Sequence, residues 1–246
     1  MLYAIIHKPL DKGAFCPCSA PTRMTLPIAS AIERVQQRAV SAALVYTSHE
    51  RWPLSPTHSL PKSPVRISVL DSSFNPPTLA HLALANAPNP CSPTSDYDAK
   101  LLLLSLRNAD KILQEGDATL SQRVEMMSLL ATRIHHNGPS SPPNIAVGLV
   151  NEPTFVAKSS ALHRFLGDRL AELVPNPSHP ISTQLTFLMG SSQYMCGVGL
   201  ILTQTIRIHS MTSRFRYSRA RICLTLLPFR RRDASIVGRI LFSRRR

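Results

Sequence analysis

Short apolar runs alternate with amphipathic segments through the middle of this chain, and this alternation restricts the fold more than any other feature. Four runs have the length and bounded apolar character of interior parallel strands: 65–70, 99–106, 144–150 and 184–190. The segments between them predict helices, at 78–87, 119–134 and 159–174. Strands and helices in alternation predict an α/β fold with a doubly wound parallel sheet.

The N-terminal part differs from this pattern. The run 30–47 predicts a helix, because Ser30 and Glu33 have capping-box spacing and apolar residues follow at helical intervals. A proline-rich linker comes next, and we interpret its Trp52 as a packing anchor. The chain is therefore divided into a disordered N-terminus (1–28), a helix and linker (29–63), an α/β domain (64–190) and an arginine-rich tail (191–246).

The charge of the chain is concentrated in that tail. The formal net charge is +14, and residues 191–246 contribute +11 of it through twelve arginines against a single acid, Asp233. This part shows no strand–helix alternation, so we expect it to be irregular. One interpretation is a nucleic-acid-binding tail. The favoured interpretation is a retained intron or a frame shift, which would replace the natural continuation of the domain.

Other features exclude several classes of protein. No run approaches the ~18 to 20 apolar residues of a membrane span, and the N-terminus lacks the pattern of a secretory signal. The five cysteines are scattered, and the Cys16–Cys18 pair does not have zinc-site spacing. We expect a cytoplasmic or nuclear protein with no membrane partner and no metal held by its own side chains.

The segment 68–88, SVLDSSFNPPTLAHLALANAP, passes from a strand through a polar turn into a helix. Backbone N–H groups and the positive end of a helix dipole meet at such an elbow, which attracts phosphate. Ser72, Ser73 and Thr78 add hydroxyl donors, and Asn75 can fix the turn or reach a ligand. The turn has neither the glycines of the Walker loop nor those of the dinucleotide fingerprint.

His81 follows Thr78 by three residues, so the two side chains share one face at the helix start. A phosphate there would raise the pKa of His81 and favour its charged form, which donates to phosphate oxygens. The alternative is structural: Thr78 caps the helix, and His81 only packs.

This segment resembles the nucleotide-binding signature of the nicotinamide mononucleotide adenylyltransferases, which are nucleotidyltransferases with an [HT]-x-G-H motif. The family pattern G-S-F-N-P-x-T-x-x-H-L is matched in register by Ser73, Phe74, Asn75, Pro76, Thr78, His81 and Leu82. Two positions depart from the pattern, because Ser72 and Ala80 stand where the family has glycine. The resemblance implies a Rossmann-like nucleotidyltransferase fold.

The resemblance continues to about residue 190 and is nearest to a divergent fungal-type branch. In SLRNADKILQEGDATLSQRVEMM it implies that Asn108 and Lys111 line the nucleotide site and that Arg123 lies on the following helix. In VNEPTFVAKS it implies that Phe155 stacks on the pyridine ring, while Lys158 is as readily interpreted as exposed and idle.

The C-terminal part departs from the family. In this chain the predicted strand before the ATP-binding region ends at Gly190. The family continues at this point with an acidic G-x-D element, whereas this chain continues with two serines. The late I-S-S-T-x-x-R motif has no clear counterpart, so this part is aberrant or missing.

The resemblance implies transfer of AMP from ATP to a pyridine mononucleotide, giving NAD and pyrophosphate. His81 and Thr78 would be the catalytic residues, and Mg²⁺ would be carried with ATP. Two alternatives remain open. One is a nucleotide-binding pseudoenzyme that lacks the C-terminal ATP motif, and the other is a nucleic-acid-binding protein that acts through its basic tail.

Overall fold

The computed structural model describes residues 27–56, 64–89, 96–107, 115–134, 142–177, 181–190, 200–207 and 221–226. The predicted alternation of strand and helix is confirmed in the central part of the chain. In chain order the elements are α1 (Ile28–Gln36), β1 (Ala42–Thr47), β2 (Val65–Asp71), α2 (Leu79–Ala85), β3 (Ala99–Ser105), α3 (Leu120–Ala131), β4 (Ile145–Val150), α4 (Phe155–Leu173), β5 (Thr183–Gly190), β6 (Leu200–Arg207) and β7 (Arg221–Leu226).

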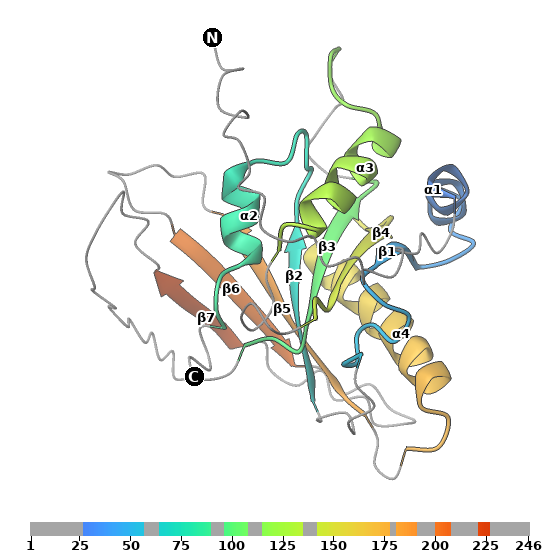
Figure 1. Cartoon of the computed structure of the whole chain (residues 1–246), viewed down its shortest axis with the longest axis vertical. Helices are drawn as coiled ribbons and strands as arrows, with labels where there is room; N and C mark the ends of the chain where they lie inside the picture. The colour runs from blue at the N-terminus through green and yellow to red at the C-terminus, as the bar shows by residue number, and fades with distance from the viewer. Residues whose placement is uncertain are drawn as a thin grey trace, which may run out of the picture.

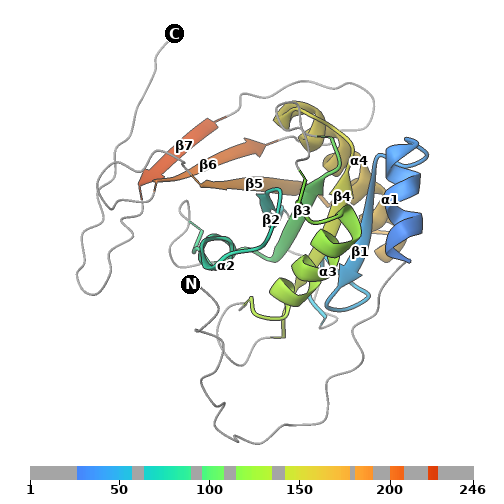
Figure 2. The same ribbon diagram turned by 90° about the horizontal axis from the view of Figure 1, so that it is seen from above.

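The strands form one sheet in the order β1-β4-β3-β2-β5-β6-β7. The four central strands β4, β3, β2 and β5 are parallel to one another, whereas β1, β6 and β7 pair antiparallel at the two sides. Helices α2 and α3 lie on one face of the sheet and α4 lies on the other (Figures 1 and 2). The predicted doubly wound α/β fold is therefore confirmed.

Each face of the sheet has its own core, because the strands bury side chains on both sides. One core packs α1, α2 and α3 against the sheet, with Leu102, Leu104 and Met127 among its buried members. The other packs α4 against the opposite face. Trp52 belongs to this second core and is fully buried, which confirms its interpretation as a packing anchor.

The predicted helix over 30–47 is wrong in its second half. α1 ends at Gln36, and residues 42–47 form β1, whose six residues are all buried against β4. The helix also begins earlier than the capping-box spacing predicted, with Pro27 at the N-cap. Alanine and leucine favour helix locally, but burial beside the open edge of β4 outweighs that preference.

The C-terminal part also differs from the expectation of irregular structure. β6 pairs antiparallel with β5, and β7 pairs antiparallel with β6. A strand on one edge offers unpaired backbone groups to any chain segment that follows, so composition alone does not exclude pairing there. Within the described ranges, every helix is too short or too polar to cross a bilayer.

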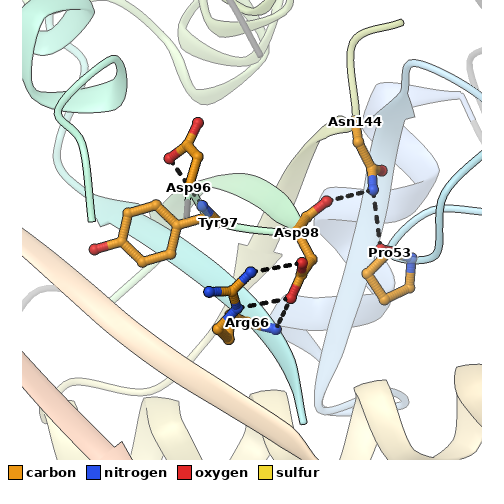
Figure 3. Close-up of polar contacts among 6 residues, drawn as sticks. All are labelled: Pro53, Arg66, Asp96, Tyr97, Asp98 and Asn144. Atoms are coloured by element: carbon orange, nitrogen blue, oxygen red, sulfur yellow. Dashed lines mark hydrogen bonds and ion pairs between the residues drawn. The ribbon is translucent and has the colours of Figure 1, made fainter. Parts of the chain in front are cut away.

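The amino ends of the parallel strands are joined by polar side chains (Figure 3). Arg66 donates from Nε and Nη2 to the two carboxylate oxygens of Asp98, at 3.0 and 2.9 Å, and this hydrogen bonding raises the pKa of Arg66. The buried Asn144 amide donates to the carbonyl oxygens of Pro53 and Asp98, at 3.0 and 2.7 Å. These bonds tie β2, β3 and β4 to the segment around Trp52, so this edge is occupied by structural contacts.

We predict that the stability of the fold decreases in acid because of His163 on α4. Burial lowers the pKa of His163 from 6.5 to about 4. Between these two pH values the unfolded chain binds a proton that the folded chain does not, so the free energy of unfolding decreases as the pH falls, by roughly 3 kcal/mol at most. Urea denaturation at pH 7.5, 6, 5 and 4 measures this.

The control is His163→Gln, which has no titrating ring. The difference in unfolding free energy between the native chain and the variant should shrink as the pH falls from 6.5 towards 4. A difference that is constant over this interval would contradict the assignment to His163.

Candidate functional site

The elbow between β2 and α2 lies at the carboxyl edge of the sheet. β2 has β3 on one side and β5 on the other: the chain passes from β2 through α2 to β3, and later returns from β4 through α4 to β5 on the far side of β2. This is the topological switch point at which doubly wound sheets bind ligands. Phe74 anchors the elbow: its side chain is fully buried, although its φ of 45° lies in the left-handed region that favours glycine. The turn is therefore held in one unusual conformation by packing.

His81 is half-buried, and both of its ring nitrogens have partners. The backbone N–H of Thr78 donates to Nδ1 at 2.9 Å, and the Thr78 hydroxyl lies 2.8 Å from the same atom. Nδ1 is then the acceptor, so in the neutral ring Nε2 carries the hydrogen and donates to Ser72 Oγ, 2.8 Å away. Burial lowers the pKa of His81, which favours this neutral form in the absence of a ligand.

The structural interpretation of Thr78 and His81 therefore holds in part. The two residues form a capping box, and Thr119 and Gln122 form the same arrangement at the start of α3. The cap uses only Nδ1 of the histidine. Nε2 points to Ser72 at the end of β2, and the ring packs against Phe74 with a centroid separation of 5.0 Å. A capping role thus leaves the other side of the ring directed at the elbow.

Asn75 ties the elbow to the start of α3. Its amide donates to Asp117 at 2.6 Å and accepts from the backbone N–H of Ala118 at 3.0 Å. Arg123 closes the arrangement, since Nε donates to the Ala118 carbonyl at 2.7 Å and Nη2 lies 3.7 Å from the Asp117 carboxylate. The structure thus brings two predicted site residues, Asn75 and Arg123, into one network, with Arg123 buried.

Lys158 braces the elbow from the opposite face of the sheet. Its ammonium lies 2.6 Å from the carboxylate of Asp71, the last residue of β2, and each side chain is only 7% exposed. Burial raises the pKa of Asp71, and the ammonium opposes that shift. The interpretation of Lys158 as exposed and idle is therefore wrong. A buried pair of this kind fixes the end of β2 relative to the start of α4.

Phe155 lies in the first turn of α4, which begins four residues earlier than predicted. The residue is 37% exposed, and its ring meets that of Phe187 of β5 edge to face, with centroids 5.7 Å apart. The Lys158 ammonium lies 5.3 Å from the centroid of the Phe155 ring. Phe155 is thus linked to Asp71 through Lys158, although 84 positions separate them in the sequence.

The remaining predicted site residues are placed unevenly. Ser73 is half-buried in the elbow, and Gly190 ends β5, the strand next to β2. Asn108 and Lys111 lie outside the described residues.

Sequence reasoning missed Asp71 and Asp117 as the partners that hold the elbow. Nothing in the sequence around Asp71 marks Lys158 as its partner. Asp117 lies in a polar loop just before the predicted helix 119–134, and this position is only a weak indication that its side chain holds the elbow. In the described part of the chain, no three His, Cys, Asp or Glu side chains are grouped as for a metal ion.

Fold and elbow together define a Rossmann-like α/β protein with its candidate site at the switch point. A Schizosaccharomyces pombe protein named "Putative nicotinamide mononucleotide adenylyltransferase" is 37% identical to this chain over 103 residues. The match spans 42% of this chain and 36% of the yeast protein, so the chain covers well under half of the length of that relative. No family model and no solved structure matches the chain.

We predict that the Asp71–Lys158 pair is strongly coupled. Lys158→Met leaves a buried carboxylate without its counter-charge and should lower the unfolding free energy by ~3 to 5 kcal/mol at pH 7. The double variant Asp71→Asn/Lys158→Met removes both charges and should recover most of that loss. Urea denaturation of the native chain, both single variants and the double variant measures the coupling. Additive losses in the four proteins would show that the pair does not act as a unit.

Proposed function

We propose that this chain is a nicotinamide mononucleotide adenylyltransferase, which transfers AMP from ATP to a pyridine mononucleotide and releases pyrophosphate. The observation that carries the proposal is the elbow, where Nε2 of His81, the hydroxyl of Ser72 and the end of β2 meet at the switch point of the sheet. The relative from Schizosaccharomyces pombe supports it through its name.

The proposed reaction is an in-line displacement. A 5′-phosphate oxygen of the mononucleotide forms a bond to the α-phosphorus of ATP, and the bond from that phosphorus to the pyrophosphate oxygen breaks. Both reactants bring their own phosphates, so the protein needs no covalent intermediate. Its contribution is orientation and stabilisation of the charge that grows on the pyrophosphate.

His81 is the proposed donor to the phosphates. Since Nδ1 is held by Thr78, the ring is already oriented, and Nε2–H can exchange the hydroxyl of Ser72 for a phosphate oxygen. The released Ser72 hydroxyl can then donate to the same phosphate. A bound anion raises the pKa of the imidazole, opposing the effect of burial.

Other residues have proposed supporting roles. Thr78, Ser73 and the backbone of the turn would contact the triphosphate, and Asn75 would keep the turn in place through Asp117. Phe155 would stack on the pyridine ring. Asn108, Lys111, Arg123 and Gly190 remain proposed members of the nucleotide site. Magnesium carried with ATP supplies charge neutralisation at the phosphates.

The decisive variant is His81→Gln, because glutamine keeps the capping box that Gln122 already makes in α3. We expect the variant to fold with nearly native stability and to lose about 10²- to 10³-fold in kcat, as on removal of an oxyanion donor. Dinucleotide formation from ATP, Mg²⁺ and nicotinamide mononucleotide is measured by chromatography.

Two comparisons make the result specific. His81→Ala removes both the cap and the donor, so it should lose activity similarly and also some stability. His163→Gln changes a histidine outside the elbow and should keep native kcat. Near-native turnover in His81→Gln would contradict the catalytic role. Binding of ATP without dinucleotide formation by the native chain would instead identify a pseudoenzyme.

A further inference from the structure

A cleft lies at the carboxyl edge of the sheet, near its β1 side. It has a volume of about 370 Å³ and is lined by Val35 near the end of α1, the connection between α1 and β1, the two residues after β4 and Arg164 of α4. Its polar lining includes Arg38, Ser41, Asn151, Glu152 and Arg164. This volume is in the range of small-molecule sites. None of these residues takes part in the elbow described above.

Two arginines enter this cleft from different elements. Arg38 follows α1, and Arg164 is on α4; both side chains are exposed. Among the residues that the structure describes, neither guanidinium has a hydrogen bond or ion pair with another group. Arg66, Arg123 and Arg169, by contrast, are each bound to carbonyl or carboxylate oxygens. The cleft is thus lined by two arginines whose guanidinium groups have no partner among the described residues.

The backbone at Arg38 is a second, independent observation. Arg38 has a φ of 57° and ends α1 in a Schellman-type turn, in which Ala39 N–H donates to the Arg34 carbonyl at 2.9 Å. Glycine is the usual residue at this position, and another residue there costs stability. Left-handed conformations of residues other than glycine cluster at active and binding sites. Here the left-handed residue is an arginine that lines the cleft.

We propose that this cleft binds a small phosphate monoester, separately from the nucleotide site at the elbow. Two guanidiniums against one carboxylate, that of Glu152, leave a net charge of +1 in the lining, which suits an anion. Guanidinium donors pair bidentately with phosphate oxygens. The Glu152 carboxylate has no partner among the described side chains, so it can accept from a hydroxyl of the ester. This assignment does not depend on the proposed adenylyl transfer.

The test is a titration of the full chain with glycerol 3-phosphate at constant ionic strength. Backbone amide signals of Val40, Ser41 and Asn151 in nuclear magnetic resonance spectra report on the cleft. We expect saturable shifts of these signals in the native protein. Arg38→Gly and Arg164→Gln should each weaken the binding about tenfold, because each removes a charge-assisted contact.

Arg38→Gly also separates binding from folding. Glycine relieves the left-handed backbone, so the variant should be at least as stable as the native chain while it binds more weakly. Arg34→Gln is the matched control, since it removes the same charge one turn away, outside the lining of the cleft. Because salt screens the interaction between the ester and a charge outside the cleft, this variant should change the dissociation constant by less than about twofold.

Three outcomes would overturn the proposal. The first is the absence of saturable shifts at the cleft amides. The second is an equal weakening by Arg34→Gln, which would indicate binding to net positive charge only. The third is loss of these shifts in His81→Gln, which would place the ester at the elbow instead. Failure of dinucleotide formation with intact cleft binding would leave this proposal standing.

Discussion

The buried ion pair between Asp71 and Lys158 is the interaction on which the candidate site depends most. Removing two charges from water is costly, and an apolar pair of similar volume would serve stability as well or better. What an ion pair adds is a defined geometry. A 2.6 Å contact places the last residue of β2 relative to the first turn of α4, and the elbow begins at the next residue. On the other face of the sheet, Asn75 fixes the elbow to the residues before α3. The turn is held from both sides, which explains how Phe74 keeps a left-handed conformation.

This bracing gives His81 its orientation. The capping interaction with Thr78 determines which nitrogen carries the hydrogen, and thereby directs a donor toward the end of β2. Structural and catalytic interpretations of a Thr-x-x-His pair are usually treated as alternatives. Here the cap is what holds the ring, because it uses Nδ1 and leaves Nε2 directed at the end of β2. The capping box at Thr119 shows that a glutamine suffices for the cap alone.

Local sequence patterns predicted the strands whose side chains are buried along most of their length. β3 and β4 are short, largely apolar runs that are buried almost throughout, so their identity follows from composition and length. β1 was missed because Ala42–Tyr46 is equally compatible with a helix face, and only the free edge of β4 decides between the two. Pairings between distant residues had no local signal either. Lys158 and Asp71 are 87 residues apart, and nothing in the sequence around Arg123 marks its side chain as buried. The elbow itself was predicted, since strand, turn and helix follow one another directly in the sequence.

α1 and β1 pack with the α/β sheet, since β1 pairs with β4 and α1 belongs to the same core as α2 and α3. Without β1, the outer edge of β4 would present unpaired backbone groups, a known route to aggregation. β1 pairs antiparallel with β4, so its first residues reach the carboxyl edge of the sheet, where α1 must also end. The reversal between α1 and β1 is completed in five residues, and a left-handed residue is the compact way to make it. Pairing of β1 with the edge of β4 therefore requires the tight turn after α1. That turn places the backbone of Arg38 at the cleft beside α4. The same short connection that completes the sheet also creates the second candidate binding site.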